Sequence, residues 1–185
     1  VHDSMPHNAE SWFISRVLRR VHHAHPHVQL LFSWADGILG KPGYVYQASN
    51  FLYGGAILTE MYLTTEGIRV HPRSVQVIGR REQDGPGLLS RSFHRTQQLG
   101  LTKYFGYQFR YIFPLCSKKQ WHVLEAHSPM SWSRLYPKQQ DCQWWQQIGL
   151  GERIRCELPP FRKGQLVKAQ YAIDQRLALF PKEQE

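Results

Sequence analysis

Residues 28–55, VQLLFSWADGILGKPGYVYQASNFLYGG, contain the elements that decide the fold. Residues 28–34 form a short, nearly continuous apolar run, which predicts a strand covered on both faces. Residues 37–43 hold three glycines and a proline, which predicts a turn-rich loop after the strand. Residues 44–55 predict a short helix closed by a pair of glycines. Ligands of open α/β sheets bind where strands end, so we expect a cleft beside this loop.

A helix is predicted just before this strand, over residues 9–23. Asn8 is a suitable N-cap, and Pro26 ends the pattern. Apolar residues at i, i+3, i+4 and i+7 predict one face that packs on the core. This face consists of Ile14, Val17, Leu18 and Val21. The opposite side carries Arg16, Arg19 and Arg20.

The rest of the chain predicts further strands and one more helix. Residues 57–65 and 68–78 look like strands, residues 88–99 like a helix, and residues 104–115 like an aromatic-rich strand. Beyond residue 115 the tryptophans are spread among Gln, Ser, Pro and Lys without a clear period. We therefore expect an ordered domain over residues 1–115 and an irregular extension over residues 116–185.

The composition favours an anionic partner. The chain has 185 residues, with 23 Lys and Arg against 14 Asp and Glu, and a formal charge of +9 at pH 7. Such a surface attracts DNA, RNA or anionic lipid. No apolar run is long enough to cross a bilayer, and the N-terminal residues lack the apolar region of a signal peptide. We expect a soluble, intracellular protein.

Neither the cysteines nor the histidines predict a metal site. The cysteines are odd in number and form no C-x-x-C pair, so they are interpreted as reduced thiols. They are Cys116, Cys142 and Cys156. A histidine run invites a metal interpretation, because imidazole is a common ligand, but it lies around a helix end without H-E-x-x-H spacing. It consists of His22, His23, His25 and His27, and a solvated helix terminus is favoured.

Three motifs in the first part of the chain resemble the Mom family of phage DNA-modifying enzymes. They are PHNAESWFISRVLR at residues 6–19, SWAD at residues 33–36 and GKPGYVYQASNFLYGG at residues 40–55. In that family a P-x-N-S/A-E-S loop opens a helix, a strand ends in A-D, and a helix begins G-x-x-Y-Q-A-S/A-N-F/W. Order and spacing are the same here. Weaker similarity continues to about residue 115, and residues 135–138 resemble an L-x-Y-P-K motif.

The resemblance implies a fold like that of GNAT acyltransferases, an α/β (α+β) mixed sheet flanked by helices. The family has earlier strands and helices before the 9–23 helix, and we expect these N-terminal strands to be missing. Residues 1–115 would then be the C-terminal part of the catalytic domain.

The resemblance also implies an enzyme that transfers a carbamoylmethyl group to N6 of adenine in double-stranded DNA. This modification protects phage DNA from host restriction in the cytoplasm of the bacterial cell. The base must leave the stack before its amino group can be reached. Two alternatives stay open: an acetyl-CoA-dependent acyltransferase acting on a protein or small molecule, and a DNA-binding fragment without activity.

Asp36, Tyr46 and Asn50 are the candidate catalytic residues. Asp36 ends a strand, where a carboxylate can orient the adenine amino group or act as a base. Tyr46 and Asn50 share one face of the predicted helix, so the three side chains are expected to share a cleft. Tyr46 can donate a hydrogen bond, and Asn50 can pair with a base edge. The alternatives are a turn-capping Asp36 and aromatic packing at Tyr44 and Tyr53.

Two further sets of residues are candidates for binding. The turn that opens the first helix can hold the pyrophosphate of acetyl-CoA or a related acyl donor, or it can be an ordinary cap. This turn consists of Asn8, Ala9, Glu10 and Ser11. Basic and amide groups in the middle of the chain suit contacts to phosphates and bases. The expected DNA-binding residues are Gln47, Arg73, Arg80, Arg81, Arg95 and Lys103.

Overall fold

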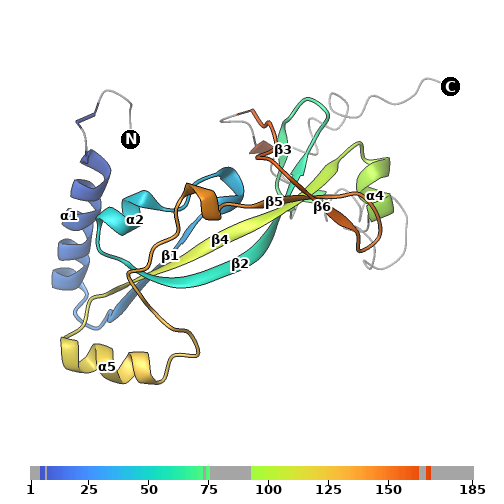
Figure 1. The fold of residues 1–185 in the computed structure, drawn as a ribbon. Coiled ribbons are helices and arrows are strands. Elements are labelled where there is room, and N and C mark those ends of the chain that lie inside the picture. The colour runs from blue at the N-terminus through green and yellow to red at the C-terminus, as the bar shows by residue number, and fades with distance from the viewer. Residues whose placement is uncertain (1–4, 7, 73, 76–92, 163–165, 168–185) are drawn as a thin grey trace. The chain divides into compact units, whose positions relative to one another are not determined.

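The computed structural model describes residues 5–6, 8–72, 74–75, 93–162 and 166–167 of the chain. Its helices are α1 (Ala9–Ala24), α2 (Tyr44–Ala48), α4 (Phe93–Gln98) and α5 (Lys118–Ala126), with 3-10 turns η1 (Gly37–Leu39) and η2 (Gln139–Asp141). Figure 1 labels these helices and the strands described below. The predicted α+β class is confirmed.

The strands form one mixed sheet with the order β6-β5-β4-β2-β3-β7, and β1 also pairs with β4. They are β1 (Leu30–Ala35), β2 (Leu52–Leu63), β3 (Arg69–Val70), β4 (Thr102–Pro114), β5 (Trp144–Gln147), β6 (Arg153–Cys156) and β7 (Leu166–Val167). β3 and β7 pair in parallel, whereas β1 with β4, β2 with β3, β4 with β5 and β5 with β6 are antiparallel. The predicted strand over residues 104–115 is confirmed as β4.

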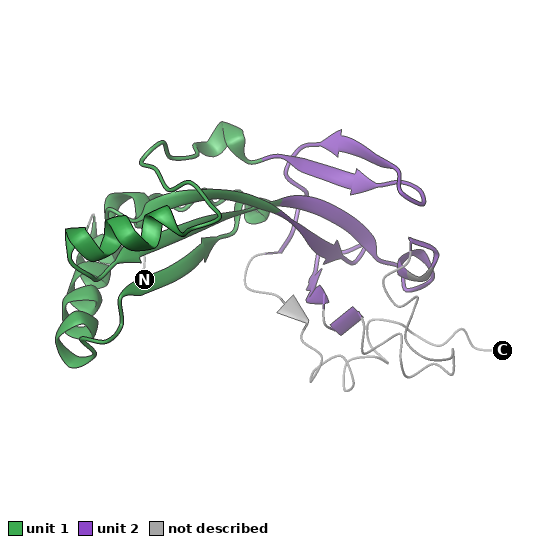
Figure 2. Ribbon diagram, turned by 90° about the horizontal axis from the view of Figure 1, so that it is seen from below, with its two compact units in different colours: residues 1–57, 107–142 green, residues 58–106, 143–185 purple. Residues whose placement is uncertain are grey.

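The chain divides into two compact units (Figure 2). Unit 1 comprises residues 1–57 and 107–142, and unit 2 comprises residues 58–106 and 143–185. β2 and β4 contribute residues to both units. The units therefore interleave along the sequence instead of meeting at residue 115.

In unit 1, α1 packs largely as its sequence predicts. Leu18 is buried, and Ile14 and Val21 are half-buried, but Val17 is 40% exposed and does not belong to the core face. The predicted N-cap is also wrong in its chemistry. Asn8 adopts a left-handed conformation and its side chain makes no capping hydrogen bond. The Ala9 N–H donates to the Pro6 carbonyl.

β1 has one covered and one exposed side, which contradicts the prediction of a strand covered on both faces. Phe32 and Trp34 are 50% and 38% exposed, whereas Ala35 is buried. The two exposed rings contact each other edge to face, and the Arg110 guanidinium lies 5.8 Å from the Trp34 ring. Alternation along the strand places Phe32 and Trp34 on the same side.

The helix predicted over residues 44–55 ends at Ala48, earlier than expected. Asn50 has φ +62°, the Phe51 N–H donates to the Tyr46 carbonyl, and the Asn50 N–H donates to the Gln47 carbonyl. This is a Schellman cap with asparagine at its left-handed position, and the Tyr46 and Phe51 rings make its apolar contact at 5.3 Å. The paired glycines at residues 54–55 lie in β2 instead of capping the helix.

Unit 2 has its own apolar core around the end of β2. The core consists of Tyr62, Val70, Val75, Leu99 and Leu101. The strand predicted over residues 68–78 is confirmed only as β3, because the chain turns helical at Pro72, a residue suited to a first helical position. Residues 73 and 76–78 lie outside the described residues. The described part of the helix predicted over residues 88–99 is α4; residues 88–92 lie outside the described residues.

Residues after 115 are more regular than the expected irregular extension. α5 begins with a capping box, in which Ser117 and Gln120 satisfy each other's backbone N–H groups. β5 and β6 then form an antiparallel pair. The three cysteines are free thiols, and within the described residues no helix is long and apolar enough to span a membrane.

Candidate active site and nucleic-acid interface

The loop between β1 and α2 is fixed to β4 by one tyrosine and one glutamine. The Tyr111 hydroxyl donates to the Pro42 carbonyl. The Gln47 Nε2 lies 3.1 Å from the Tyr111 oxygen and donates to the carbonyls of Pro42 and Pro137 at 3.3 and 2.9 Å. Gln47 therefore joins the loop to the 135–138 segment. Its amide nitrogen is already engaged, which makes Gln47 a positioning residue in this structure.

Gly43 is required where this loop approaches β4. It has φ +91°, and a Cβ built on it would lie 2.7 Å from the Tyr111 ring and 2.8 Å from the Ala35 Cβ. Only glycine adopts that conformation without strain and also fits the space. The loop is thereby held in one place beside the end of β1.

Asp36 lies at the end of β1 with its carboxylate partly exposed. Its Oδ1 accepts a hydrogen bond from the Gln108 Nε2 at 2.8 Å, while its backbone carbonyl accepts from the Leu39 and Lys41 N–H groups. The side chain itself caps no turn. Within the described residues, the second carboxylate oxygen has no hydrogen-bond partner, so it can accept a proton or orient an amino group.

Asp36, Tyr46 and Asn50 are not brought together. Asp36 is bonded to Gln108, whereas the Tyr46 ring packs on Tyr111, 5.3 Å between centroids. Positions 108 and 111 of β4 point to opposite faces, because side chains alternate along a strand. Asn50 lines a separate pocket beside α1. The predicted shared cleft is therefore wrong, while the individual catalytic roles stay predictions.

Tyrosines gather on the Tyr46 side of β4, a feature that the sequence prediction missed. The Tyr53 ring lies 5.9 Å from Tyr111 and 6.2 Å from Phe109. Burial raises the pKa of Tyr53, and the nearby Asp141 carboxylate adds to the increase. Burial likewise raises the pKa of Tyr111 to about 12. Both phenols stay protonated at neutral pH and can serve as hydrogen-bond donors. Only the density of tyrosine in the sequence pointed to them.

The expected DNA-binding residues do not form a described basic surface. Lys103 pairs with Glu60 at 2.7 Å, and its side chain is only 11% exposed. Arg73, Arg80 and Arg81 lie outside the described residues, as does the side chain of Arg95. Their DNA contacts stay predictions.

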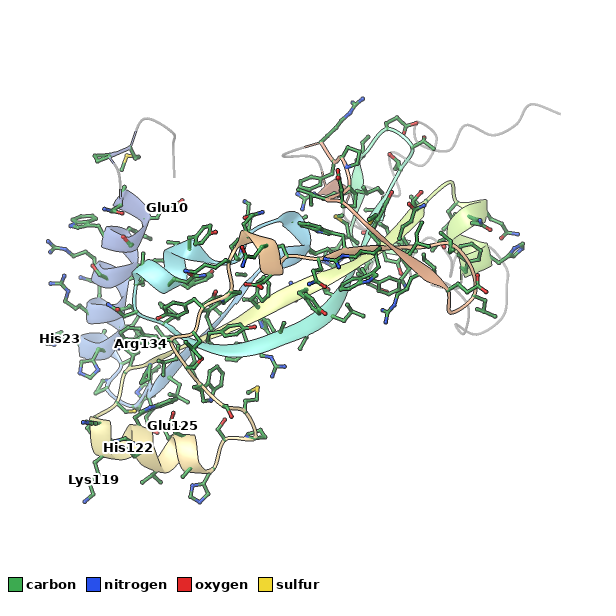
Figure 3. All side chains as sticks on the ribbon, in the orientation of Figure 1. Glu10, His23, Lys119, His122, Glu125 and Arg134 are labelled. Carbon is green, nitrogen blue, oxygen red and sulfur yellow. The ribbon has the colours of Figure 1, made fainter. Side chains whose placement is uncertain are left out.

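An exposed basic and aromatic surface does exist on α1. Trp12 and Phe13 are each 60% exposed, and the Arg16 guanidinium lies 5.0 Å from the Trp12 ring. Arg20 and His23 continue the same side of the helix, and Figure 3 shows His23 pointing away from the sheet. We call Trp12, Phe13, Arg16, Arg20 and His23 the α1 basic surface. Cations beside exposed rings suit contacts to phosphates and stacking on bases.

The first turn of α1, the predicted site for the pyrophosphate of the group donor, is partly engaged by the chain itself, and donor binding there stays a prediction. The Ala9 N–H donates to the Pro6 carbonyl at 3.0 Å, and the Ser11 hydroxyl donates to the Asn8 carbonyl at 3.1 Å. The exposed Glu10 carboxylate adds negative charge to the same turn, which repels an anion. Among the described residues, no group of three or more His, Cys, Asp and Glu side chains could hold a metal ion.

Comparison with known proteins identifies the family. Residues 1–138 match the Mom protein family, and the chain belongs to that family. It is also similar to "Methylcarbamoylase mom" of Escherichia phage Mu, with 38% identity over 85 residues. The matched segment covers 46% of this chain and 35% of the phage Mu protein. The chain thus matches about one third of the length of its curated relative.

Proposed function

We propose that this protein modifies DNA by transferring a carbamoylmethyl group to N6 of adenine in the duplex, in the cytoplasm of a bacterial cell. The observation that carries the proposal is membership of the Mom family over residues 1–138, with a relative named methylcarbamoylase. The exposed cations and rings of the α1 basic surface support an anionic polymer as substrate.

In this proposal Asp36 acts on the adenine amino group. The lone pair of N6 is delocalised into the purine ring, so the nitrogen attacks better when a carboxylate accepts one of its protons. As N6 bonds to the CH2 carbon, the bond from that carbon to the leaving group of the donor breaks, and the electron pair of that bond departs with the leaving group. The free oxygen of Asp36 is suited to this, because Gln108 holds the other oxygen in place. Tyr46 stabilises the neighbouring loop through its contact with Tyr111.

The target adenine must leave the base stack to reach Asp36. Adenine flipped from a duplex needs contacts that hold the flanking backbone, and arginine side chains supply them. Arg16 and Arg20 are exposed on α1 and, within the described residues, form no ion pair, so both are available for phosphates.

Replacing Arg16 and Arg20 together by glutamine should weaken duplex binding and reduce its dependence on salt. Each lost phosphate contact lowers the slope of log K against log salt concentration by about 1, so the double variant should lose about 2. Fluorescence anisotropy with a labelled duplex between about 50 and 200 mM salt measures this slope.

The matched control is Lys118→Gln with Lys119→Gln, which removes the same charge from the exposed start of α5. Its salt slope should stay near that of the unchanged protein. Equal slopes for both double variants would show that only net charge matters and would reject α1 as the DNA-contacting surface.

Protection from restriction tests the proposed function in cells. Plasmid DNA from cells that produce this chain should resist endonucleases whose sites contain adenine and should still be cut by enzymes with sites of only G·C pairs. Cells that produce the Asp36→Asn variant supply the control. Plasmid that is cut equally by both kinds of endonuclease would contradict adenine modification by this chain.

A further inference from the structure

A pocket of about 500 Å³ lies in unit 1 beside the C-terminal half of α1. This volume is within the range of small-molecule sites. Its walls are Ser15, Leu18, Arg19, His22, Ser49, Asn50, Phe113, Pro114, Leu115 and Cys116. Of the three candidate catalytic residues, Asn50 lines the pocket, whereas Asp36 and Tyr46 do not.

The pocket has an apolar floor and a positively charged rim. Leu18 and Leu115 are buried, and the half-buried Phe113 ring, which also lines the pocket, packs on Phe51 with 5.2 Å between ring centroids. Arg19 and His22 are exposed at the rim. No acidic residue lines the pocket, and Arg19 forms no ion pair within the described residues. This lining suits a flat apolar group attached to an anion.

Asn50 adds a polar recognition group to this rim. Its backbone is fixed by the Schellman cap at φ +62°, whereas its side-chain amide forms no hydrogen bond with any described residue. The amide carries an NH2 donor group beside a carbonyl acceptor, the pair that matches the N6 and N7 edge of adenine. By contrast, the hydroxyls of Ser15 and Ser49 already donate to the Trp12 and Val45 carbonyls.

We propose that this pocket binds a nucleotide unit, with the base between Phe113 and Asn50 and the phosphate at Arg19 and His22. Phe113 supplies a stacking face, Asn50 an amide for the base edge, and Arg19 a permanent charge for the phosphate. A free mononucleotide and a nucleotide within a DNA strand share this chemistry. The site goes beyond the proposed transfer reaction, because Asp36 does not line it, and it gives the base-pairing role predicted for Asn50 a binding function instead of a catalytic one.

Calorimetric titration of the purified chain with adenosine monophosphate, adenosine and inorganic phosphate tests the site. The nucleotide should bind with Kd below about 1 mM, and at least tenfold tighter than either of its parts. Arg19→Gln should weaken nucleotide binding at least about tenfold and leave adenosine binding unchanged. Asn50→Gly keeps the left-handed backbone and should weaken nucleotide and nucleoside equally.

Arg155→Gln is the control, because it removes the same charge from an exposed arginine of β6 that does not line the pocket. Thermal unfolding confirms that each variant is folded. No measurable nucleotide binding, or an equal loss of affinity in the Arg19 and Arg155 variants, would overturn the proposal.

Competition between adenosine monophosphate and a single-stranded oligodeoxyadenylate would assign the site to a DNA strand. Nucleotide binding without competition would assign it to a free nucleotide.

Discussion

Asp36→Asn should reduce adenine modification by roughly 10²- to 10⁴-fold, the usual contribution of a general base. Asparagine keeps the size of the side chain and an oxygen that can accept the hydrogen bond from Gln108. It lacks the negative charge that withdraws a proton from the amino group. Stability and duplex affinity should stay near those of the unchanged protein. Modified nucleosides per unit of enzyme are the measurement.

The control is Asp141→Asn, the same chemical change at an exposed carboxylate of unit 1. Asp141 accepts a hydrogen bond from the Lys138 N–H at 2.7 Å, and asparagine can keep that bond. Its modification rate should stay near normal. A folded Asp36→Asn enzyme with full activity would remove Asp36 from the mechanism.

Gly43→Ala should destabilise the protein more than an alanine substitution at a glycine whose Cβ position has no neighbouring atoms. The left-handed backbone alone costs a residue with a Cβ about 1–3 kcal/mol. At Gly43 the new Cβ also meets the Tyr111 ring at 2.7 Å, which adds about 1–3 kcal/mol of overpacking. The free energy of unfolding, from denaturant titration, measures the sum.

Gly55→Ala separates the two contributions. Gly55 has φ +85°, close to that of Gly43, but nothing lies within 4 Å of its Cβ position. This variant should show only the backbone cost. Equal losses of stability for the two variants would show that the Tyr111 ring moves aside to make room for the new Cβ. The loop would then not be held against β4 as described.

Local signals in the sequence predicted α1, β1 and β4, because their apolar periods and stop signals agree with their tertiary contacts. The end of α2 could not be predicted in this way. The paired glycines favoured a cap after residue 53, but Gly54 is needed in β2, where a Cβ would lie 2.2 Å from the Trp132 ring. That contact joins residues far apart in sequence.

By contrast, the capping box of α5 was predictable from the S-K-K-Q sequence at residues 117–120.

The candidate site was predicted in its parts but not in its assembly. The sequence placed Asp36 at a strand end, which the structure confirms. Which face its carboxylate occupies depends on the register of β1 with β4, which pairs Ala35 with Phe109. Register is set by remote contacts, so the separation of Asp36 from Tyr46 was not predictable. The burial of Lys103 against Glu60 is likewise a tertiary property.

Mass analysis of nucleosides shows whether this chain modifies adenine and with which group. DNA from cells that produce this chain is digested to nucleosides and compared with DNA from cells that produce Asp36→Asn. The expected result is a deoxyadenosine heavier by one carbamoylmethyl group, with fragmentation placing the addition on N6, and its near absence in the variant. Unmodified deoxyadenosine in cells with soluble, folded chain, or an acetyl group in place of carbamoylmethyl, would contradict it.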